Sequence, residues 1–441
     1  MSQESLFPGA EPLPSAAPRP PEGAPRFQPP VRNQGEWTHT ELDLLLGADH
    51  RARDVWRFVR SLDLQPFYGR IRATERHAGR PPIDPRILMA LWLYATVEGV
   101  GSARALARLC QEHDAYRWIC GGVSVNHHTL SDFRSGHGER LDRLLTQSVA
   151  ALMAEGLVTL ERVAQDGVRV RASAGAASFR GKDALAHCMK EAQEQVETLK
   201  RELDEDPAAT TARQAAARTR AAREREERVD RAIAQREEAE KRKKDEEDKK
   251  KVRASTTDAD ARVMKMGDGG FRPAFNAQFA TDAASQIVVG VSASNEGTDG
   301  AQLAPMVEQL ERRYDRRPRE MLVDGGYVKL EAFEQVTAAG TVVYAPTREP
   351  TATNPDPHAP RPGDGPAVAA WRTRMGTDAA KTIYKERAAT AECVNALARN
   401  RGLRQLLVRG VEKAGTVFLW MAIAHNMMRA VSLRAASLAS A

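Results

Sequence analysis

The sequence has few cysteines, and none has the spacing of a metal site. Only four occur among 441 residues, and no two form a Cys-x-x-Cys pair: Cys110, Cys120, Cys188 and Cys393. Structural zinc sites and disulfide frameworks both need clustered or regularly spaced cysteines. The pattern therefore argues against both kinds of site and favours a reducing cytoplasm.

Long apolar runs are also absent. No stretch of eighteen apolar residues occurs, so the sequence predicts no membrane-spanning helix. The first residues, MSQESLFPGAEPLPSAAPRPPEG, lack the basic start and apolar stretch of a secretory signal. Arginine and alanine are frequent, which hints at a GC-rich bacterial genome. We expect a bacterial protein of the cytoplasm, associated with the nucleoid.

The sequence has only a small excess of positive charge. The net charge of +6 suits a polyanionic partner such as nucleic acid, but does not require one. Hydrophobic residues make up 42% of the chain, which is enough for a sizeable core. The length fits two or three domains.

The first part of the chain is predicted to be helical after a disordered start. Residues 1–37 are rich in Pro, Gly, Ala and Ser and are predicted to be disordered. Residues 38–158 contain several short amphipathic helices joined by turns that carry glycine, and one of them, PPIDPRILMALWLYATVEG, ends at Gly99. This arrangement favours an all-helical, helix-turn-helix-like DNA-binding domain.

Residues 159–430 are predicted to form a mixed α/β (α+β) catalytic domain. LERVAQDGVRVRA (160–172) alternates like a strand, FRPAFNAQFATD and SQIVVGVSAS predict a hairpin turning at 282–285, and EMLVDGGY predicts a short buried strand. A meander followed by alternating helices and strands is the order of an RNase H-like sheet. Residues 183–252 predict an inserted charged helical hairpin, either a solvated spacer or a dimerisation or DNA-clamping arm. Residues 431–441 predict a frayed tail.

Three acidic residues stand where a metal-dependent phosphodiester reaction would need them. Two Mg²⁺ ions about 4 Å apart can activate a nucleophile and stabilise a leaving oxygen, and such ions prefer carboxylate ligands. Asp166 lies in the first strand, Asp324 ends the fourth, and these strands are neighbours in the predicted topology. Each is followed by glycine, which allows metal and DNA backbone to approach closely. Glu392 lies on a late helix that can lean on the sheet.

At these residues the chain resembles the DDE transposases of bacterial insertion sequences, in the branch with an all-helical N-terminal domain. VAQDGVRVRASA and MLVDGGY are similar to the strands that carry the two aspartates. YKERAATAECVNALARNRG is similar to the Y-x2-R…E…K signature and places Tyr384, Arg387 and Glu392 on matching positions. HHTLSDFR and ARVMKMGDGGFRPAFNAQFATD add to the likeness, which covers most of residues 38–430.

The resemblance implies that Asp166, Asp324 and Glu392 bind two Mg²⁺ or Mn²⁺ ions and catalyse DNA cleavage and strand transfer without a covalent protein–DNA intermediate. The sequence departs from the signature at Arg399, where lysine is usual, but the positive charge is kept. Glu386, close to Glu392, is the alternative catalytic acid. Spacing from the signature residues favours Glu392.

Other residues are candidates for binding DNA or supporting the site. Arginines on helices suit phosphate contact, and Trp371, in the loop before the Glu392 helix, suits either stacking on an unpaired base or core packing. The DNA-binding candidates are Arg134, Tyr384, Arg387, Arg399, Arg404 and Trp371. Asp282 is interpreted as a hairpin-turn residue. Asp299 is interpreted as a helix start that alternatively supports the active site.

The sequence thus predicts a DNA transposase. Its expected partners are the inverted repeats at the transposon ends and target DNA, and it is expected to act as a homodimer or higher synaptic complex. Two alternatives remain open. One is a decayed or domesticated copy that only binds DNA, and the other is an RNase H-like nuclease that does not transpose.

Overall fold

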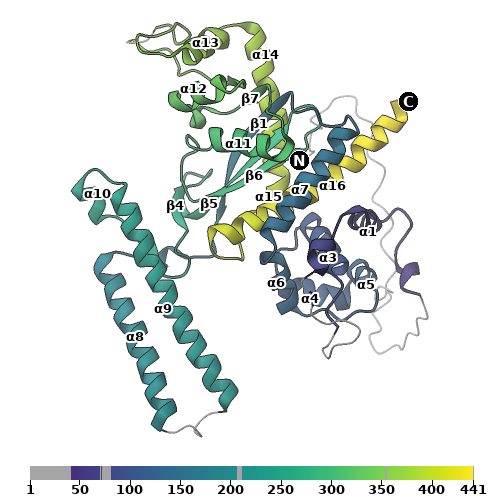
Figure 1. The fold of residues 1–441 in the computed structure, drawn as a ribbon, viewed down its shortest axis with the longest axis vertical. Coiled ribbons are helices and arrows are strands. Elements are labelled where there is room, and N and C mark those ends of the chain that lie inside the picture. Colours follow the sequence, from purple (N-terminus) through teal and green to yellow (C-terminus); the bar gives the residue numbers. More distant parts are fainter. Residues whose placement is uncertain (1–40, 70, 72–80, 206–210, 353–354, 441) are drawn as a thin grey trace, which may run out of the picture. The chain divides into compact units, whose positions relative to one another are not determined.

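The computed structural model describes residues 41–440, apart from residue 70 and the stretches 72–80, 206–210 and 353–354 (Figure 1). The segment 1–37, for which the sequence predicts disorder, lies outside the described residues. From Leu42 onward the described residues form one compact unit. None of the described helices is both long and apolar enough to pass through a membrane.

The N-terminal part is helical, as predicted. Its elements are η1 (Leu42–Leu45), α1 (Arg51–Ser61), α2 (Gln65–Tyr68), α3 (Pro85–Val97), α4 (Ala103–Glu112), α5 (Asp114–Cys120), α6 (His127–Ser135) and α7 (Gly138–Ala154). Helix α3 is buried on nearly every side, which explains its continuous apolar sequence. Asp84 caps it by accepting a hydrogen bond from the backbone N–H of Arg86, with Pro85 in the first turn. Ser102 caps α4.

A mixed sheet follows. Its strands are β1 (Arg162–Arg171), β4 (Arg262–Lys265), β5 (Phe271–Asp282), β6 (Val288–Ser294), β7 (Glu320–Leu322) and β8 (Val342–Tyr344). The order is β4-β5-β1-β7-β8, and β6 also pairs with β5. Strands β1, β5 and β6 are antiparallel, whereas β7 and β8 run parallel to β1. The predicted β5–β6 hairpin and the predicted neighbourhood of β1 and β7 are therefore confirmed.

The hairpin turn between β5 and β6 depends on Asp282. Its buried carboxylate accepts hydrogen bonds from the backbone N–H and the hydroxyl of Ser285, at 3.0 and 2.6 Å. It also accepts one from the backbone N–H of Leu160, at 3.1 Å. Asp282 is thus the turn residue that the sequence indicates.

Helices complete the second half of the chain. They are α11 (Leu303–Tyr314), η3 (Gly325–Tyr327), α12 (Leu330–Ala338), α13 (Pro366–Met375), α14 (Asp378–Arg387), the π-helical turn η4 (Ala388–Glu392), α15 (Cys393–Asn400) and α16 (Val411–Ser440). The prediction of a frayed tail from residue 431 is wrong for the described residues, because α16 continues to Ser440. Arg434 within it pairs with Glu155, at 2.6 Å.

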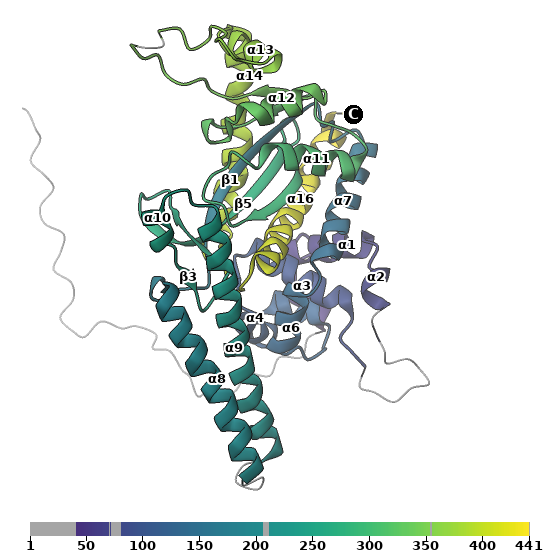
Figure 2. The ribbon, with the colours of Figure 1, turned by 60° about the vertical axis from the view of Figure 1, so that its left-hand side comes forward.

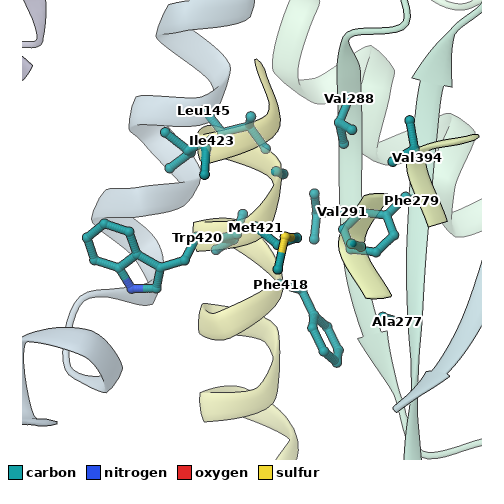
Figure 3. Close-up of a cluster of buried hydrophobic side chains, with 14 of the residues drawn as sticks. Leu145, Ala277, Phe279, Val288, Val291, Val394, Phe418, Trp420, Met421 and Ile423 are labelled. Carbon is teal, nitrogen blue, oxygen red and sulfur yellow. The ribbon is translucent and has the colours of Figure 1, made fainter. Parts of the chain in front are cut away.

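Helix α16 joins the N-terminal helices to the sheet. It contacts α3, α6 and α7 on one side and β5 and β6 on the other. Figure 3 shows Phe418 and Ile423 of α16 between Leu145 of α7 and the side chains of Phe279 and Val291 on the strands. All five residues are buried. The two halves of the chain therefore share one hydrophobic core.

The predicted charged insert is a helical hairpin. Helices α8 (Lys182–Glu205) and α9 (Ala212–Lys241) lie side by side in both views and contact each other along their length (Figures 1 and 2). The short helix α10 (Glu246–Lys250) follows, and β2 (Phe179–Arg180) pairs with β3 (Ala254–Ser255) at the base. Val196, Leu199 and Ala222 form a small apolar cluster between the two long helices. Arg225 also pairs with Glu191 across them, at 3.0 Å.

Candidate active site

Asp166 and Asp324 lie at corresponding positions on neighbouring strands. The parallel register pairs Ala164 of β1 with Leu322 of β7, two residues before each aspartate. Asp324 stands two residues after the end of β7 and caps η3, since its Oδ1 accepts a hydrogen bond from the N–H of Gly326 at 2.8 Å. The sheet thereby brings together two acids that are far apart in the sequence.

Asp166 is held in a mostly buried environment. Its side chain is 17% exposed. Its Oδ1 accepts a hydrogen bond from the N–H of Gly167 at 2.9 Å, and its Oδ2 accepts one from Nδ2 of Asn395 at 3.0 Å. Burial raises the pKa of Asp166 to about 6, with the charge of Asp324 adding to the rise and the nearby Arg387 guanidinium opposing it. The carboxyl therefore binds a proton more readily than an ordinary aspartate.

A π-helical turn brings Arg387 and Glu392 together. Nη2 of Arg387 lies 3.0 Å from Oε1 of Glu392, and its Nη1 lies 3.6 Å from Oδ2 of Asp166. Residues five apart do not share a face of a regular α-helix, but the i→i+5 turn of η4 aligns them. The guanidinium thus stands between the two acids, with its side chain 14% exposed, while that of Glu392 is 57% exposed.

Tyr384 lies beside Arg387 on helix α14. The Cζ of Arg387 lies 5.9 Å from the centre of the Tyr384 ring. Burial would lower the pKa of Arg387, but attraction from Tyr384, Asp166, Asp324 and Glu392 raises it overall. Arg387 therefore carries its positive charge within the acidic site.

Glu386 has a different environment. Its carboxylate pairs with Nη1 of Arg162 at 2.7 Å, and Nε of Arg162 also pairs with Glu320 at 2.6 Å. Arg162 is the first residue of β1, four positions before Asp166. Glu386 thus links α14 to the start of the strand.

Two residues that the sequence analysis missed hold the helix that carries Glu392. Asn395 donates to Asp166, and its position three residues after Glu392, on one helical face, was a signal that could have revealed it. Gln286, in the β5–β6 turn, donates from Nε2 to the carbonyl of Ala389 in η4, at 3.1 Å. Its backbone is left-handed, with φ of 58°. Nothing in the local sequence indicated this second contact, because it depends on the tertiary fold.

The chemistry of the donors fits a hard divalent cation. Two aspartates and one glutamate supply only oxygen, the ligand type that Mg²⁺ and Mn²⁺ prefer. Oδ1 of Asn395, beside Asp166, is buried and has no hydrogen-bond partner. Among the described residues, however, no three His, Cys, Asp or Glu side chains converge closely enough to hold an ion, since the Arg387 guanidinium stands between Asp166 and Glu392.

Two DNA-binding candidates have roles in packing. Arg134 donates to the carbonyl of Gly101 and stacks 4.8 Å from the Trp92 ring, and burial lowers the pKa of its guanidinium to about 10. Trp371 was expected in a loop but lies in α13, 2% exposed, and donates from Nε1 to the carbonyl of Ala345 at 3.0 Å. Of the two roles considered for Trp371, base stacking and core packing, the structure thus favours core packing.

Arg399 and Arg404 are exposed. Nε of Arg404 donates to the carbonyl of Arg399 at 3.3 Å, and its own carbonyl accepts from the N–H of Arg171 at the end of β1. The two side chains are therefore accessible to a partner beyond the helix that carries Glu392.

Two family models match parts of this chain. Residues 41–136 match the family described as Transposase domain (DUF772), and residues 366–431 match the family described as Transposase DDE domain. Both matches are to transposase domains, and together they support an insertion-sequence DDE transposase. The second match runs from α13 into α16 and includes Arg387 and Glu392. No curated protein and no solved structure gives a significant match. A DDE transposase acts on DNA, and its class generally uses divalent metal ions.

Proposed function

We propose that this transposase uses Asp166, Asp324 and Glu392 as a metal-binding triad on an RNase H-like sheet. The observation that carries the proposal is the parallel register of β1 and β7, which places Asp166 and Asp324 side by side. The path β5-β1-β7-β8, antiparallel from β5 to β1 and then parallel, with β6 also paired to β5, supports the RNase H-like assignment. Arg387 contacts both Asp166 and Glu392, so the third acid lies on the same side of the site.

Glu392 is preferred to Glu386 as the third acid. Glu386 is occupied by Arg162 at the start of β1, whereas Glu392 reaches the guanidinium that touches Asp166. The carboxylate of Glu392 is 57% exposed, so it can move toward a ligand without leaving a buried environment.

The residues around the proposed triad orient its carboxylates and supply one positive charge. When bound, two Mg²⁺ or Mn²⁺ ions would supply a polarised nucleophile and stabilise the leaving oxygen. Asn395 and the N–H of Gly167 orient the carboxylate of Asp166, and the N–H of Gly326 orients that of Asp324. Arg387 provides a positive charge that can move from the acids to a DNA phosphate as the site is loaded.

We propose that the DNA phosphate backbone contacts two exposed arginines near this site. Arg399 and Arg404 present their guanidinium groups beyond the C-terminus of α15. We expect the N-terminal helices to recognise the inverted repeats, and a homodimer or higher synaptic complex to hold the transposon ends and the target DNA. Replacing Arg399 or Arg404 with glutamine should weaken binding to all duplexes alike and reduce the salt dependence by about one phosphate contact each.

The decisive experiment replaces Asp166 or Asp324 with asparagine in the full-length protein. Each variant should lose Mg²⁺- or Mn²⁺-dependent cleavage of DNA that carries the transposon ends, while binding those ends in a gel-shift assay without metal. Asp315→Asn is the matched control, because Asp315 is exposed at the end of α11, where asparagine also accepts its left-handed backbone. Retained cleavage in Asp166→Asn would refute the triad.

The reaction products of the wild-type protein distinguish a transposase from the two alternative functions. Joined strand-transfer products indicate transposition, and simple nicks without joining indicate an RNase H-like nuclease. Binding of the ends without any metal-dependent cleavage indicates a protein that only binds DNA.

A further inference from the structure

A buried polar network lies on the face of the sheet opposite the Asp166 side chain. Asp299, in the segment between β6 and α11, has a side chain only 8% exposed. Its Oδ1 accepts hydrogen bonds from Nδ2 of Asn276 at 2.6 Å and from Nε2 of Gln278 at 2.7 Å. Its Oδ2 pairs with Nη2 of Arg169 at 3.2 Å. Burying a carboxylate is costly, and these donors offset that cost.

The network packs directly against the backbone of the residue next to Asp166. Gly167 faces it, and a Cβ added to Gly167 would lie 2.5 Å from Oδ1 of Asp299 and 2.5 Å from Nε2 of Gln278. The backbone of Gly167 is not left-handed, so glycine is needed here for space rather than for conformation. Asp299 therefore occupies the position that a side chain at residue 167 would fill.

The same network reaches the second aspartate. A Cβ added to Gly326 would lie 3.5 Å from Oδ2 of Asp299 and 3.0 Å from Oδ1 of Asp324. Gly326 is the residue whose N–H binds Asp324. The next residue, Tyr327, is fully buried and donates its hydroxyl hydrogen to Oε1 of Gln278. One buried carboxylate and its donors thus lie behind both the part of β1 that carries Asp166 and the turn that carries Asp324.

We propose that Asp299 is a positioning residue that fixes the relative placement of Asp166 and Asp324 from behind the sheet. This inference rests on the proposed triad and adds to it a residue outside that triad. Asp299 does not ligate the ions itself, because its oxygens are taken by Asn276, Gln278 and Arg169. It acts through the backbone at Gly167 and Gly326. Residues that orient metal ligands typically contribute about 10- to 100-fold in metal affinity or activity.

The test compares Asp299→Asn with Asp364→Asn in the full-length protein. Asp364 is a matched control, because it also forms a buried ion pair, with Arg372 at 2.7 Å, and the two side chains are 5% and 7% exposed. Mn²⁺ binding is measured by the electron paramagnetic resonance signal of free Mn²⁺, alongside DNA cleavage, unfolding temperature and metal-free binding of the DNA ends.

Asp299→Asn should bind Mn²⁺ about 10- to 100-fold more weakly and cleave correspondingly less, yet bind DNA ends normally. Asp364→Asn should lose comparable stability but keep its Mn²⁺ affinity. Equal Mn²⁺ affinity in Asp299→Asn and the wild type would overturn the proposal, as would an equal loss in Asp364→Asn.

Tyr327→Phe decides the question if Asp299→Asn does not fold. It removes one hydroxyl from the network and leaves the buried ring, so a several-fold loss of Mn²⁺ affinity is expected, and unchanged affinity in the folded variant would overturn the proposal. Asp166→Asn is measured in parallel. If that variant keeps Mn²⁺ binding and cleavage, the proposed triad itself fails. If it loses both while Asp299→Asn behaves like Asp364→Asn, only the role of Asp299 fails.

Discussion

Arg387 and Glu392 are five residues apart and form an ion pair of 3.0 Å across a π-helical turn. Such turns are rare within helices and occur frequently at functional sites. Here the turn aligns the two side chains, and the guanidinium of Arg387 also reaches Asp166 in the middle of β1. In a regular helix, Glu392 would share a face with Ala388 and Ala389 instead. The local departure from α-helical geometry therefore places Glu392 on the guanidinium that also lies beside Asp166.

The first prediction separates the two glutamates of this helix. Glu392→Gln should reduce metal-dependent DNA cleavage to background. Glu386→Gln should leave it within a few-fold of the wild type, because Glu386 only forms the partly exposed ion pair with Arg162. Its loss should cost about 0.2–1 kcal/mol of stability. A cleavage assay and thermal unfolding of both variants check this, and the opposite ranking would assign catalysis to Glu386.

The second prediction concerns the contact that holds the π-helical turn. Gln286→Gly removes the hydrogen bond to the carbonyl of Ala389. A single hydrogen bond contributes about 0.5–1.5 kcal/mol, so cleavage should fall between a few-fold and about tenfold while DNA binding is kept. Gln286→Ala removes the same bond but also strains the left-handed backbone. It should be less stable than Gln286→Gly but cleave no better. Full cleavage by a folded Gln286→Gly would show that the contact does not position Glu392.

The third prediction is a pH dependence of stability. Burial lowers the pKa of His425 from 6.5 to about 4, helped by the charges of Arg401 and Arg429, and its Nε2 lies 2.9 Å from the carbonyl of Gln286. Between these pH values the unfolded chain binds a proton that the folded chain does not. Stability is therefore fully present above about pH 6.5 and is lost as the pH falls, by on the order of 3 kcal/mol at pH 4.

Denaturant unfolding of the wild type and of His425→Gln at pH 7 and pH 5 tests this dependence. Glutamine can still donate to the carbonyl of Gln286 but does not titrate. The loss of stability between the two pH values should be smaller in the variant, and equal losses would contradict the assignment.

The fourth prediction assigns Trp371 to the core. Trp371→Phe leaves the carbonyl of Ala345 without its donor in a buried position. The variant should lose about 1–3 kcal/mol of stability. Binding to DNA ends with unpaired terminal bases should not change. Weaker binding to those ends at unchanged stability would instead support base stacking.

Much of the fold was predictable because it depends on local patterns. The apolar run of α3, the alternation of β1 and the turn at Asp282 each leave a signal within a few residues. Asp166 and Asp324 were expected on neighbouring strands, and the pairing of β1 with β7 confirms that these strands are neighbours. In contrast, β4 was missed because its sequence, RVMK, contains no apolar run of the kind that marks a buried strand, and only Met264 of its four residues is buried.

The remaining features of the site depend on tertiary contacts. The contact of Gln286 with Ala389 and the hydrogen bonds of Asp299 join segments that are distant in the chain. Arginine at position 134 looks like a phosphate ligand in sequence, but its burial depends on Trp92, in another helix. Patterns within one segment do not contain such information.

The position of α16 between the N-terminal helices and the sheet has a consequence during synthesis. On the ribosome, α3, α7 and β6 are made before α16, so the apolar surfaces that it covers are exposed to solvent in the growing chain. The nascent polypeptide can complete its interior only after Phe418 and Ile423 have emerged from the exit tunnel. Until then we expect the nascent chain to bind chaperones through these apolar surfaces. A chain truncated before α16 should be prone to aggregation for the same reason.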